Sequence, residues 1–193
     1  MESARAVILR LYYGMNERYS GYMEMDGAAQ ANYLRDAVII WRREIGQTLD
    51  HLEMRSEMDM GRLVAWGVSY GAAIGIPALA TESRIRGMLL MFGGLLNYKL
   101  PAIASTVNYL PRITVPVLLV NGRFDPTFPH GTSQQSLFDH LGTPAELKKW
   151  YVYEGGHATY EGALEAAVIL ESVDWLDSTR GPSRRTSSHA RLR

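Results

Sequence analysis

Short apolar runs that alternate with helical patterns are the feature that most constrains how this chain can fold. Runs typical of buried strands occupy residues 6–12, 63–66, 88–92, 115–120 and 148–153. A glycine follows each run closely, and most of the segments between the runs show helical spacing of apolar residues. Near-continuous apolar strands separated by helices are typical of a parallel sheet that is buried on both faces. We therefore predict an α/β fold, with a mostly parallel sheet of about five strands covered by helices on both faces.

The helices are predicted from apolar residues that recur every three or four positions. The longest predicted helix covers residues 34–52, and shorter helices are expected over 72–81, 133–141 and 160–177. Pro77 lies inside the second of these four segments. Because proline removes a backbone hydrogen bond from a helix interior, we expect a kinked or shortened helix there.

The composition narrows the range of functions. The chain has 193 residues, a length typical of a single domain. Its 20 basic and 20 acidic residues cancel, which argues against nucleic acid as the main partner. It contains no cysteine, which excludes disulfides, cysteine zinc sites and a cysteine nucleophile. No apolar run approaches the roughly 20 residues of a membrane span and no signal peptide is visible, so we expect a cytoplasmic protein without a membrane partner.

The last residues of the chain differ in composition from the rest. Residues 179–193 contain five arginines and no acidic residue, together with serine, threonine, glycine and proline. Such a segment cannot bury enough apolar surface to offset the entropy of ordering. We therefore predict a domain over residues 1–178, followed by a disordered basic tail.

A serine motif stands at the junction of a predicted strand and a predicted helix. The pentapeptide Gly67-Val68-Ser69-Tyr70-Gly71 matches G-x-S-x-G. Glycines lack a Cβ, so the strand and the helix can approach closely while the serine is lifted above the sheet edge. Ser69 is therefore a candidate nucleophile, and the N–H of Tyr70 is a candidate donor to a developing oxyanion. A glycine-rich strand end with an inert serine is the structural alternative.

An acid and a histidine follow the serine in the order that hydrolases of this type use. Asp125 lies just after the fourth apolar run, and His157 lies just after the fifth. Because the carboxyl ends of parallel strands meet at one edge of a sheet, we expect both side chains near Ser69. The alternatives are a turn residue before Pro126 for Asp125 and a loop or capping role for His157.

No metal ion or cofactor is predicted. Histidines and acidic residues do not cluster at zinc-ligand spacing, and the chain has no glycine-rich phosphate loop. We interpret the remaining histidines as surface or partly packed residues: His51, His130, His140 and His189.

At this point the sequence resembles a known family. The motifs Gly-Val-Ser-Tyr-Gly, Asn-Gly-Arg-Phe-Asp-Pro and Glu-Gly-Gly-His together resemble those of the α/β-hydrolase superfamily. The nearest branch is the dienelactone-hydrolase and prolyl-oligopeptidase-like group, and closer still are the hydrolase domains of bacterial kinase–hydrolase fusions. Residues 40–46 and 132–138 support that branch. The resemblance covers about residues 5–177 and implies fusion to, or association with, a protein kinase domain.

The sequence also differs from the family that it resembles. Dienelactone hydrolase itself uses a cysteine, which this chain lacks. The family has several strands before the position of residues 6–12, and the loop after the third of them supplies a second oxyanion donor. The implied protein is therefore an N-terminally truncated hydrolase, in which we interpret Tyr12 and Tyr13 as packing aromatics. In a compact fold we expect the 6–12 run to pair beside the 63–66 run.

The implied activity is that of a serine hydrolase acting on a small-molecule ester, a thioester or a peptide. We expect Ser69 to attack, His157 to take its proton and Asp125 to hold the imidazole tautomer. Leu95 and Phe128 are expected to contact the substrate. Two alternatives remain, namely a catalytically weak or inactive hydrolase-like module used for interaction, and an acyltransferase or thioesterase that uses the same triad.

Overall fold

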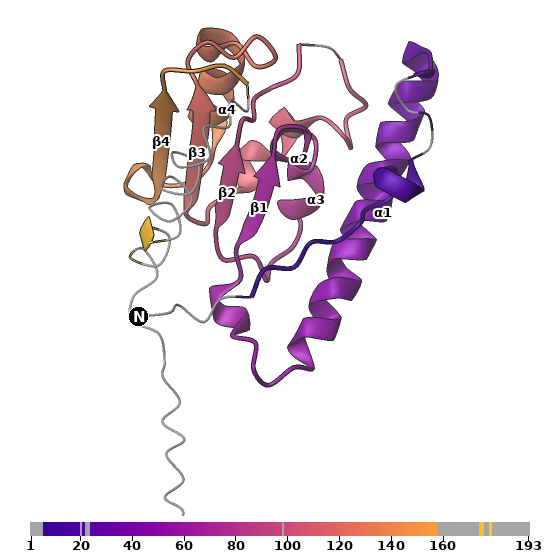
Figure 1. Ribbon diagram of the computed structural model, residues 1–193, viewed down its shortest axis with the longest axis vertical. Helices are drawn as coiled ribbons and strands as arrows, with labels where there is room; N and C mark the ends of the chain where they lie inside the picture. Colours follow the sequence, from indigo (N-terminus) through magenta and orange to yellow (C-terminus); the bar gives the residue numbers. More distant parts are fainter. Residues whose placement is uncertain are drawn as a thin grey trace, which may run out of the picture.

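The computed structural model describes residues 6–19, 21, 24–97, 99–157, 174, 175 and 178. Four strands form one sheet in the order β1-β2-β3-β4, and each pairs in parallel with the next (Figure 1). The strands are β1 (Ala65–Val68), β2 (Met88–Met91), β3 (Val117–Gly122) and β4 (Lys148–Tyr153). The predicted α/β fold with a parallel sheet is confirmed, with four strands in the described part of the chain.

The helices connect these strands. They are α1 (Gly27–Glu53), α2 (Tyr70–Ala73), α3 (Ile76–Leu79) and α4 (Gln135–His140), and a π-helix (His130–Gln134) runs directly into α4. Short 3₁₀ turns cover Asn16–Arg18, Met60–Arg62, Thr106–Asn108, Leu110–Arg112 and Ala145–Leu147. Pro77 stands near the start of α3, where its missing N–H is tolerated, so the predicted helix over 72–81 is divided into α2 and α3.

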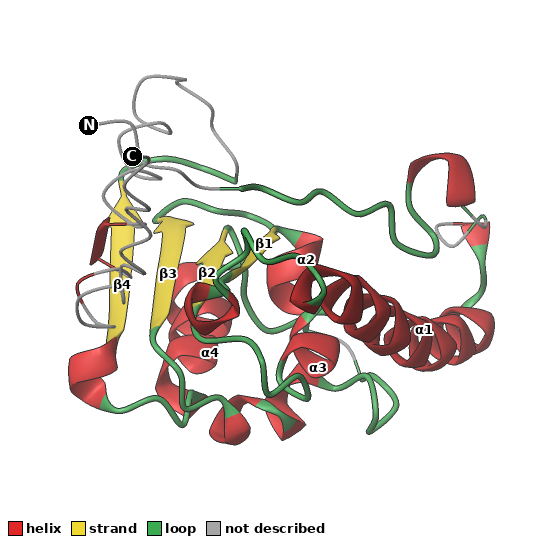
Figure 2. Cartoon of the chain, turned by 90° about the horizontal axis from the view of Figure 1, so that it is seen from below, coloured by secondary structure: helices red, strands yellow, loops and turns green. Residues whose placement is uncertain are grey.

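The sheet separates two apolar layers. Figure 2 shows α2, α3 and α4 on the same side of the sheet, with α1 beside α2 and α3. Alternate strand residues face these helices, which contribute Ile76 and Leu137 to the layer. The other strand residues form the second layer, and Trp175 packs against it. Most of the helix expected over 160–177 and the tail expected over 179–193 lie outside the described residues. Within the described part, no helix is long and apolar enough to cross a bilayer.

Helix α1 is the longest element, and its ends and its inner face follow from local chemistry. The side chain of Asp26 accepts a hydrogen bond from the N–H of Ala29 and so caps the first turn. One stripe of the helix is buried, as its apolar spacing predicts. The buried apolar residues are Leu34, Ala37, Val38, Trp41, Ile45, Leu49 and Leu52.

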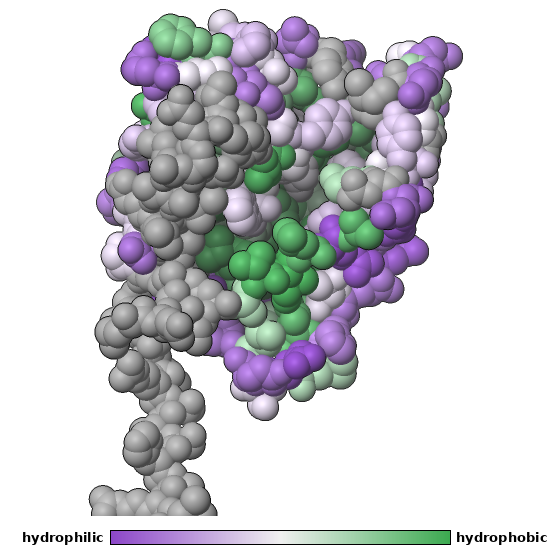
Figure 3. All heavy atoms as spheres, in the orientation of Figure 1, coloured by the Kyte–Doolittle hydropathy of each residue, from purple (hydrophilic) through white to green (hydrophobic). Residues whose placement is uncertain are grey.

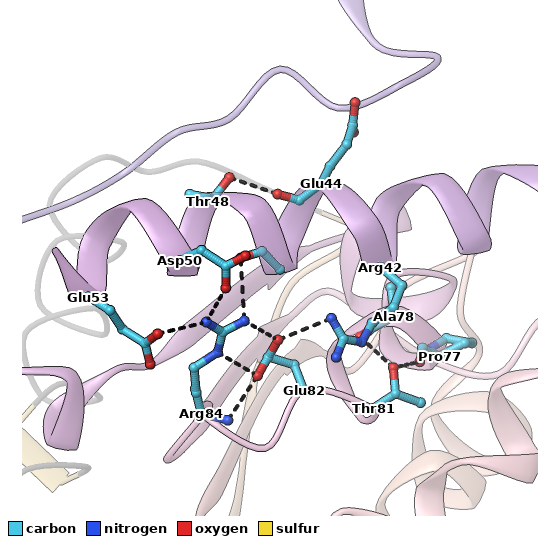
Figure 4. Close-up of polar contacts among 11 residues, drawn as sticks. Arg42, Glu44, Thr48, Asp50, Glu53, Pro77, Ala78, Thr81, Glu82 and Arg84 are labelled. Carbon is cyan, nitrogen blue, oxygen red and sulfur yellow. Dashed lines mark hydrogen bonds and ion pairs between the residues drawn. The ribbon is translucent and has the colours of Figure 1, made fainter.

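An ionic cluster fixes α1 to the turn that precedes β2 (Figure 4). The guanidinium of Arg84 contacts Asp50 and Glu53 of α1 as well as Glu82 in its own turn. Arg42 of α1 reaches Glu82 at 3.1 Å. Hydrogen bonds from Arg84 hold the pKa of the buried Glu82 carboxyl below its ordinary value, although burial acts in the opposite direction. The carboxylate is therefore kept charged by partners from both sides of the contact.

The strand predicted over residues 6–12 is wrong. This segment is extended, but it runs along α1 instead of pairing beside β1 (Figure 1). Arg10 donates a hydrogen bond to Thr48 of α1, and the indole of Trp41 donates to the carbonyl oxygen of Tyr13. These hydrogen bonds join the segment to helix side chains, whereas a strand would bond to a neighbouring backbone, and the Nε of Arg10 is buried without a hydrogen-bond partner.

Glu44 explains why the segment lies on the helix. Its carboxylate is only 6% exposed and accepts hydrogen bonds from the N–H of Tyr13 and from Arg18. Arg10 adds a second positively charged contact at 3.6 Å. A buried carboxylate is costly unless it is paired, and the N-terminal segment supplies the N–H and arginine partners that pair this one.

The segment leaves an apolar surface beside β1, which is the end strand of the sheet in the described part of the chain. Val7 is 70% exposed and Leu9 is 89% exposed, and Trp66 and Val68 of β1 are also exposed. Figure 3 shows hydrophobic residues gathered on this face of the molecule. The apolar run that predicted a strand is therefore largely exposed, since Val7, Ile8, Leu9 and Leu11 are 48% to 89% exposed.

Glu44→Gln should loosen the N-terminal segment, because a neutral amide cannot balance Arg10 and Arg18. Hydrogen bonds to charged groups typically contribute about 1.5–3 kcal/mol, so we expect the free energy of unfolding to fall by about 1–3 kcal/mol. Limited trypsin digestion followed by mass spectrometry should show faster cleavage after both arginines. Asp36→Asn is the matched control, since Asp36 is exposed and its carboxylate pairs with the adjacent Arg35. Equal cleavage rates in the two variants would contradict this role of Glu44.

Candidate active site

Ser69 stands on a strained turn between β1 and α2. Its backbone has a φ of 50° and a ψ of −110°, a combination that L-residues rarely adopt. A Cβ on Gly67 would lie 2.9 Å from the carbonyl oxygen of Gly71, so the strand and the helix approach closely at Gly67. A Cβ on Gly71 would meet nothing within 4 Å. The close approach predicted for both glycines is therefore required at Gly67 alone.

His157 lies in the turn after β4 and faces Ser69. The Oγ of Ser69 is 2.8 Å from the Nε2 of His157, which is hydrogen-bond distance. The Nδ1 of the same ring is 2.7 Å from a carboxylate oxygen of Asp125. A carboxylate only accepts, so Nδ1 carries the proton and Nε2 is left to accept from the serine hydroxyl. The three residues predicted from the sequence therefore form one hydrogen-bonded chain.

Asp125 is buried in the loop after β3, with 3% of its surface exposed. One carboxylate oxygen, Oδ1, accepts hydrogen bonds from the backbone N–H groups of Thr127 and Phe128. The other oxygen, Oδ2, is the one that contacts His157. The backbone bonds hold the carboxylate in one orientation, so Oδ2 is presented to the imidazole.

Backbone hydrogen bonds join the Asp125 loop to the His157 loop. The N–H of Arg123 donates to the carbonyl of Tyr153, and the N–H of Phe124 donates to the carbonyl of Gly155. A Cβ on Gly122 would lie 2.2 Å from the carbonyl oxygen of Gly156, so the two loops touch at a glycine. The pairing of β3 with β4 thus continues past the strand ends.

Two aromatic rings flank the imidazole. The centroid of the Phe92 ring lies 6.1 Å from that of His157, and the centroid of the Phe128 ring lies 5.8 Å away. Phe128 is 1% exposed, so it supports the imidazole from inside the protein. Leu95 is partly buried in the loop after β2, where its backbone exchanges hydrogen bonds with Ser133. Substrate contact by Leu95 and Phe128 stays a prediction.

Tyr70 is the first residue of α2, directly after Ser69. Its N–H belongs to the first turn, where helical N–H groups have no partner within the helix, but its oxyanion role stays a prediction. Tyr12 and Tyr13 pack against the apolar cluster of α1, as interpreted from the sequence. Burial raises the pKa of the Tyr12 phenol above its ordinary value, so this group is neutral at neutral pH.

Other titratable groups near the site have structural contacts. Glu154 pairs with Arg123, away from the imidazole. The rings of His130 and Trp150 lie in tilted contact, and His140 contacts a backbone oxygen within α4. Among the described residues, no group of three or more histidines and acidic residues could hold a metal ion.

The sequence reasoning missed two buried amide side chains that support the site. Asn121, at the end of β3, donates to the carbonyl of Gly93 and accepts from the indole of Trp150. Gln134, in the π-helix, is fully buried and donates to two carbonyls of the Asp125 loop. Asparagine and glutamine are usually exposed, so no pattern in the sequence marks these two as buried.

A parallel sheet that brings a serine, a histidine and an acid to one edge is the arrangement typical of the α/β-hydrolase fold, and solved structures with that fold are similar to this chain. A cold-adapted esterase from an Arctic intertidal metagenomic library, solved with zinc bound, has a TM-score of 0.57 and 25% sequence identity. The alignment covers 74% of this chain and 59% of that esterase. This chain therefore spans less than two thirds of the esterase.

More distant solved structures share the fold. A protein from Klebsiella pneumoniae described as a dienelactone hydrolase has a TM-score of 0.51 at 19% identity, over 67% of this chain and 58% of its own. Dipeptidyl peptidase 4 from Porphyromonas gingivalis has a TM-score of 0.58 at 13% identity, over 72% of this chain and 22% of its own. No family model and no curated protein sequence matches. The chain has the α/β-hydrolase fold predicted from its motifs.

Gly67→Ala should disrupt the turn that carries Ser69, whereas Gly71→Ala should be tolerated. The added Cβ at Gly67 meets rigid backbone, and overpacking of this kind typically costs about 1–3 kcal/mol. Thermal unfolding followed by circular dichroism should therefore show a clear loss of stability for Gly67→Ala alone. A Gly71→Ala variant that loses as much stability would contradict the close approach at Gly67.

Proposed function

We propose that this chain is a serine hydrolase that cleaves an ester, thioester or amide bond through an acyl-enzyme intermediate. The observation that carries the proposal is the hydrogen-bonded chain from Ser69 through His157 to Asp125. A serine hydroxyl is a weak nucleophile unless a base removes its proton, and the imidazole is within reach of that proton. The resemblance in fold to esterases and a peptidase supports the same class of reaction.

The first half-reaction forms the acyl-enzyme. His157 Nε2 accepts the proton of Ser69 as Oγ attacks the substrate carbonyl. The imidazole becomes positively charged, and the Asp125 carboxylate, 2.7 Å away at Nδ1, stabilises that charge. His157 then donates the proton to the leaving alcohol, thiol or amine, and the acyl group remains on Ser69.

The second half-reaction repeats the steps with water. His157 accepts a proton from water, the hydroxyl attacks the acyl carbonyl, and the proton returns to Ser69 as the carboxylic acid leaves. The N–H of Tyr70 serves the oxyanion in both halves, since it follows the nucleophile directly in the chain. Removing one oxyanion donor typically lowers turnover by about 10²–10³-fold, so the activity depends strongly on such N–H groups.

Labelling by a fluorophosphonate probe tests the nucleophile. The folded wild-type protein should react at Ser69, because its hydroxyl is activated by the imidazole. Ser69→Ala should abolish the reaction, and His157→Ala should slow it by several orders of magnitude, with intact-mass spectrometry as the readout. Ser83→Ala is the matched control, since Ser83 is exposed in the turn before β2 and should leave labelling unchanged. A folded wild-type protein that is not labelled would refute the proposal.

Hydrolysis of p-nitrophenyl acetate tests the acid. Asp125→Asn should lower kcat by about 10³–10⁴-fold, because an amide can hold the imidazole in the wrong tautomer. Asp139→Asn is the matched control, since Asp139 is exposed on α4 and contacts Gln135. Unchanged turnover in Asp125→Asn would show that the carboxylate does not serve His157.

Product analysis distinguishes hydrolysis from acyl transfer. The same acyl-enzyme can pass its acyl group to water or to another acceptor, so an acyltransferase or thioesterase would use the same three residues. With an alcohol present as competing acceptor, a hydrolase should release mainly the free acid. A product that is mainly the new ester would favour the transferase.

A further inference from the structure

Gln134 is a buried polar residue that the triad mechanism does not use. It ends the π-helix and has no exposed surface. Its Nε2 donates hydrogen bonds to the carbonyl oxygen of Gly122 at 2.9 Å and to that of Phe128 at 2.7 Å. These two carbonyls stand before and after Asp125 in the chain, so one amide group bridges both ends of the loop that carries the acid.

The π-helix brings this amide into the loop. The N–H groups of Ser133 and Gln134 both point to the carbonyl of Pro129, which widens the turn by one residue. Ser133 Oγ in turn donates to the carbonyl of Leu95, which fixes the π-helix to the loop after β2. A π-turn is rare and inserts an extra residue into the helix, and here the turn ends on the inward-facing Gln134.

A short path leads from Gln134 to the reacting atoms. The carbonyl of Phe128 accepts from Gln134, and the N–H of Phe128 donates to Asp125 Oδ1. Asp125 Oδ2 then contacts the imidazole of His157. Both hydrogen bonds are made by backbone groups of Phe128. A shift of these peptide groups would therefore rotate the Asp125 carboxylate away from the imidazole.

We propose that Gln134 is a positioning residue, which closes the loop of residues 122–128 and so aligns the Asp125 carboxylate with His157. The proposal rests on the proposed hydrolase function and adds a residue that touches neither the substrate nor the triad side chains. A purely structural role is the competing explanation, because any buried amide that satisfies two carbonyls also adds stability. The two explanations differ in whether the effect of Gln134 passes through Asp125.

Gln134→Met tests the proposal, because methionine has a similar length but no donor. We expect kcat for p-nitrophenyl acetate, per folded active site, to fall by about 10–100-fold, since small misplacements of catalytic groups have effects of this size. KM should change less than about two-fold, because Gln134 does not contact the substrate. Gln135→Met is the matched control, as Gln135 is the next residue and its amide donates to the exposed Asp139. A Gln134→Met protein with wild-type kcat would overturn the proposal.

A double-mutant cycle separates positioning from structure. In an Asp125→Asn background, Gln134→Met should lower kcat by less than about two-fold, because the group that it positions is already lost. An effect that does not pass through Asp125 would instead lower kcat by the same factor in both backgrounds, and that result would overturn the proposal. If Gln134→Met does not fold, Gln134→Asn takes its place, since this shorter amide keeps a donor and should give a smaller loss with the same dependence on Asp125.

Proton NMR gives a readout that needs no turnover. The proton between His157 Nδ1 and Asp125 should give a far-downfield resonance in the wild type and in Gln135→Met. In Gln134→Met this resonance should shift upfield or disappear, and an unchanged resonance would overturn the proposal. Failure of the proposed function is seen separately, as absence of fluorophosphonate labelling at Ser69 in a wild-type protein that shows the resonance.

Discussion

The parallel pairing of β3 with β4 is the constraint on which the candidate site depends. The two strands end side by side, and their pairing is extended by backbone hydrogen bonds from Arg123 and Phe124 to the loop of His157. Asp125 and His157 follow directly, so the acid and the base come from loops that are already joined. A hydrogen-bond distance of 2.7 Å between them therefore follows from the sheet register, with Gln134 and the N–H groups of Thr127 and Phe128 limiting the freedom that remains.

Ser69 is positioned next to the Asp125–His157 pair in a different way. Ser69 follows β1, two strands away from β3, and its backbone is held in a conformation that costs on the order of 1–3 kcal/mol. That cost is offset by close packing at Gly67 and by the hydrogen bond from the Ser69 N–H to the Met91 carbonyl at the end of β2. The strained turn places Oγ 2.8 Å from His157 Nε2. The strained turn at Ser69 and the ordered loops of Asp125 and His157 thus together place the serine hydroxyl beside the imidazole.

Much of this arrangement could be predicted from the sequence, because strand ends in a parallel sheet share an edge. Ser69, Asp125 and His157 each follow an apolar run. Once these runs are assigned to one parallel sheet, the three residues are expected at the same edge of it. The segment 6–12 was predicted wrongly, because its apolar pattern does not reveal that Glu44 of α1 needs partners. The N-terminal segment is held on α1 by polar contacts between residues about 30 positions apart, such as the one between Tyr13 and Glu44. Gln134 was missed for a similar reason, since its burial depends on a π-turn that leaves no signal in residue spacing.

The central claim is that Ser69 carries the acyl group during turnover. The direct measurement is rapid quenching of the reaction with p-nitrophenyl acetate, followed by tryptic digestion and mass spectrometry. Trypsin releases residues 63–84 as one peptide, which holds both Ser69 and Ser83. We expect one acetyl group on this peptide, assigned to Ser69 by fragmentation, formed before steady-state turnover and absent in Ser69→Ala. Turnover of the ester without acetylation of Ser69, or with the acetyl group on another residue, would contradict it.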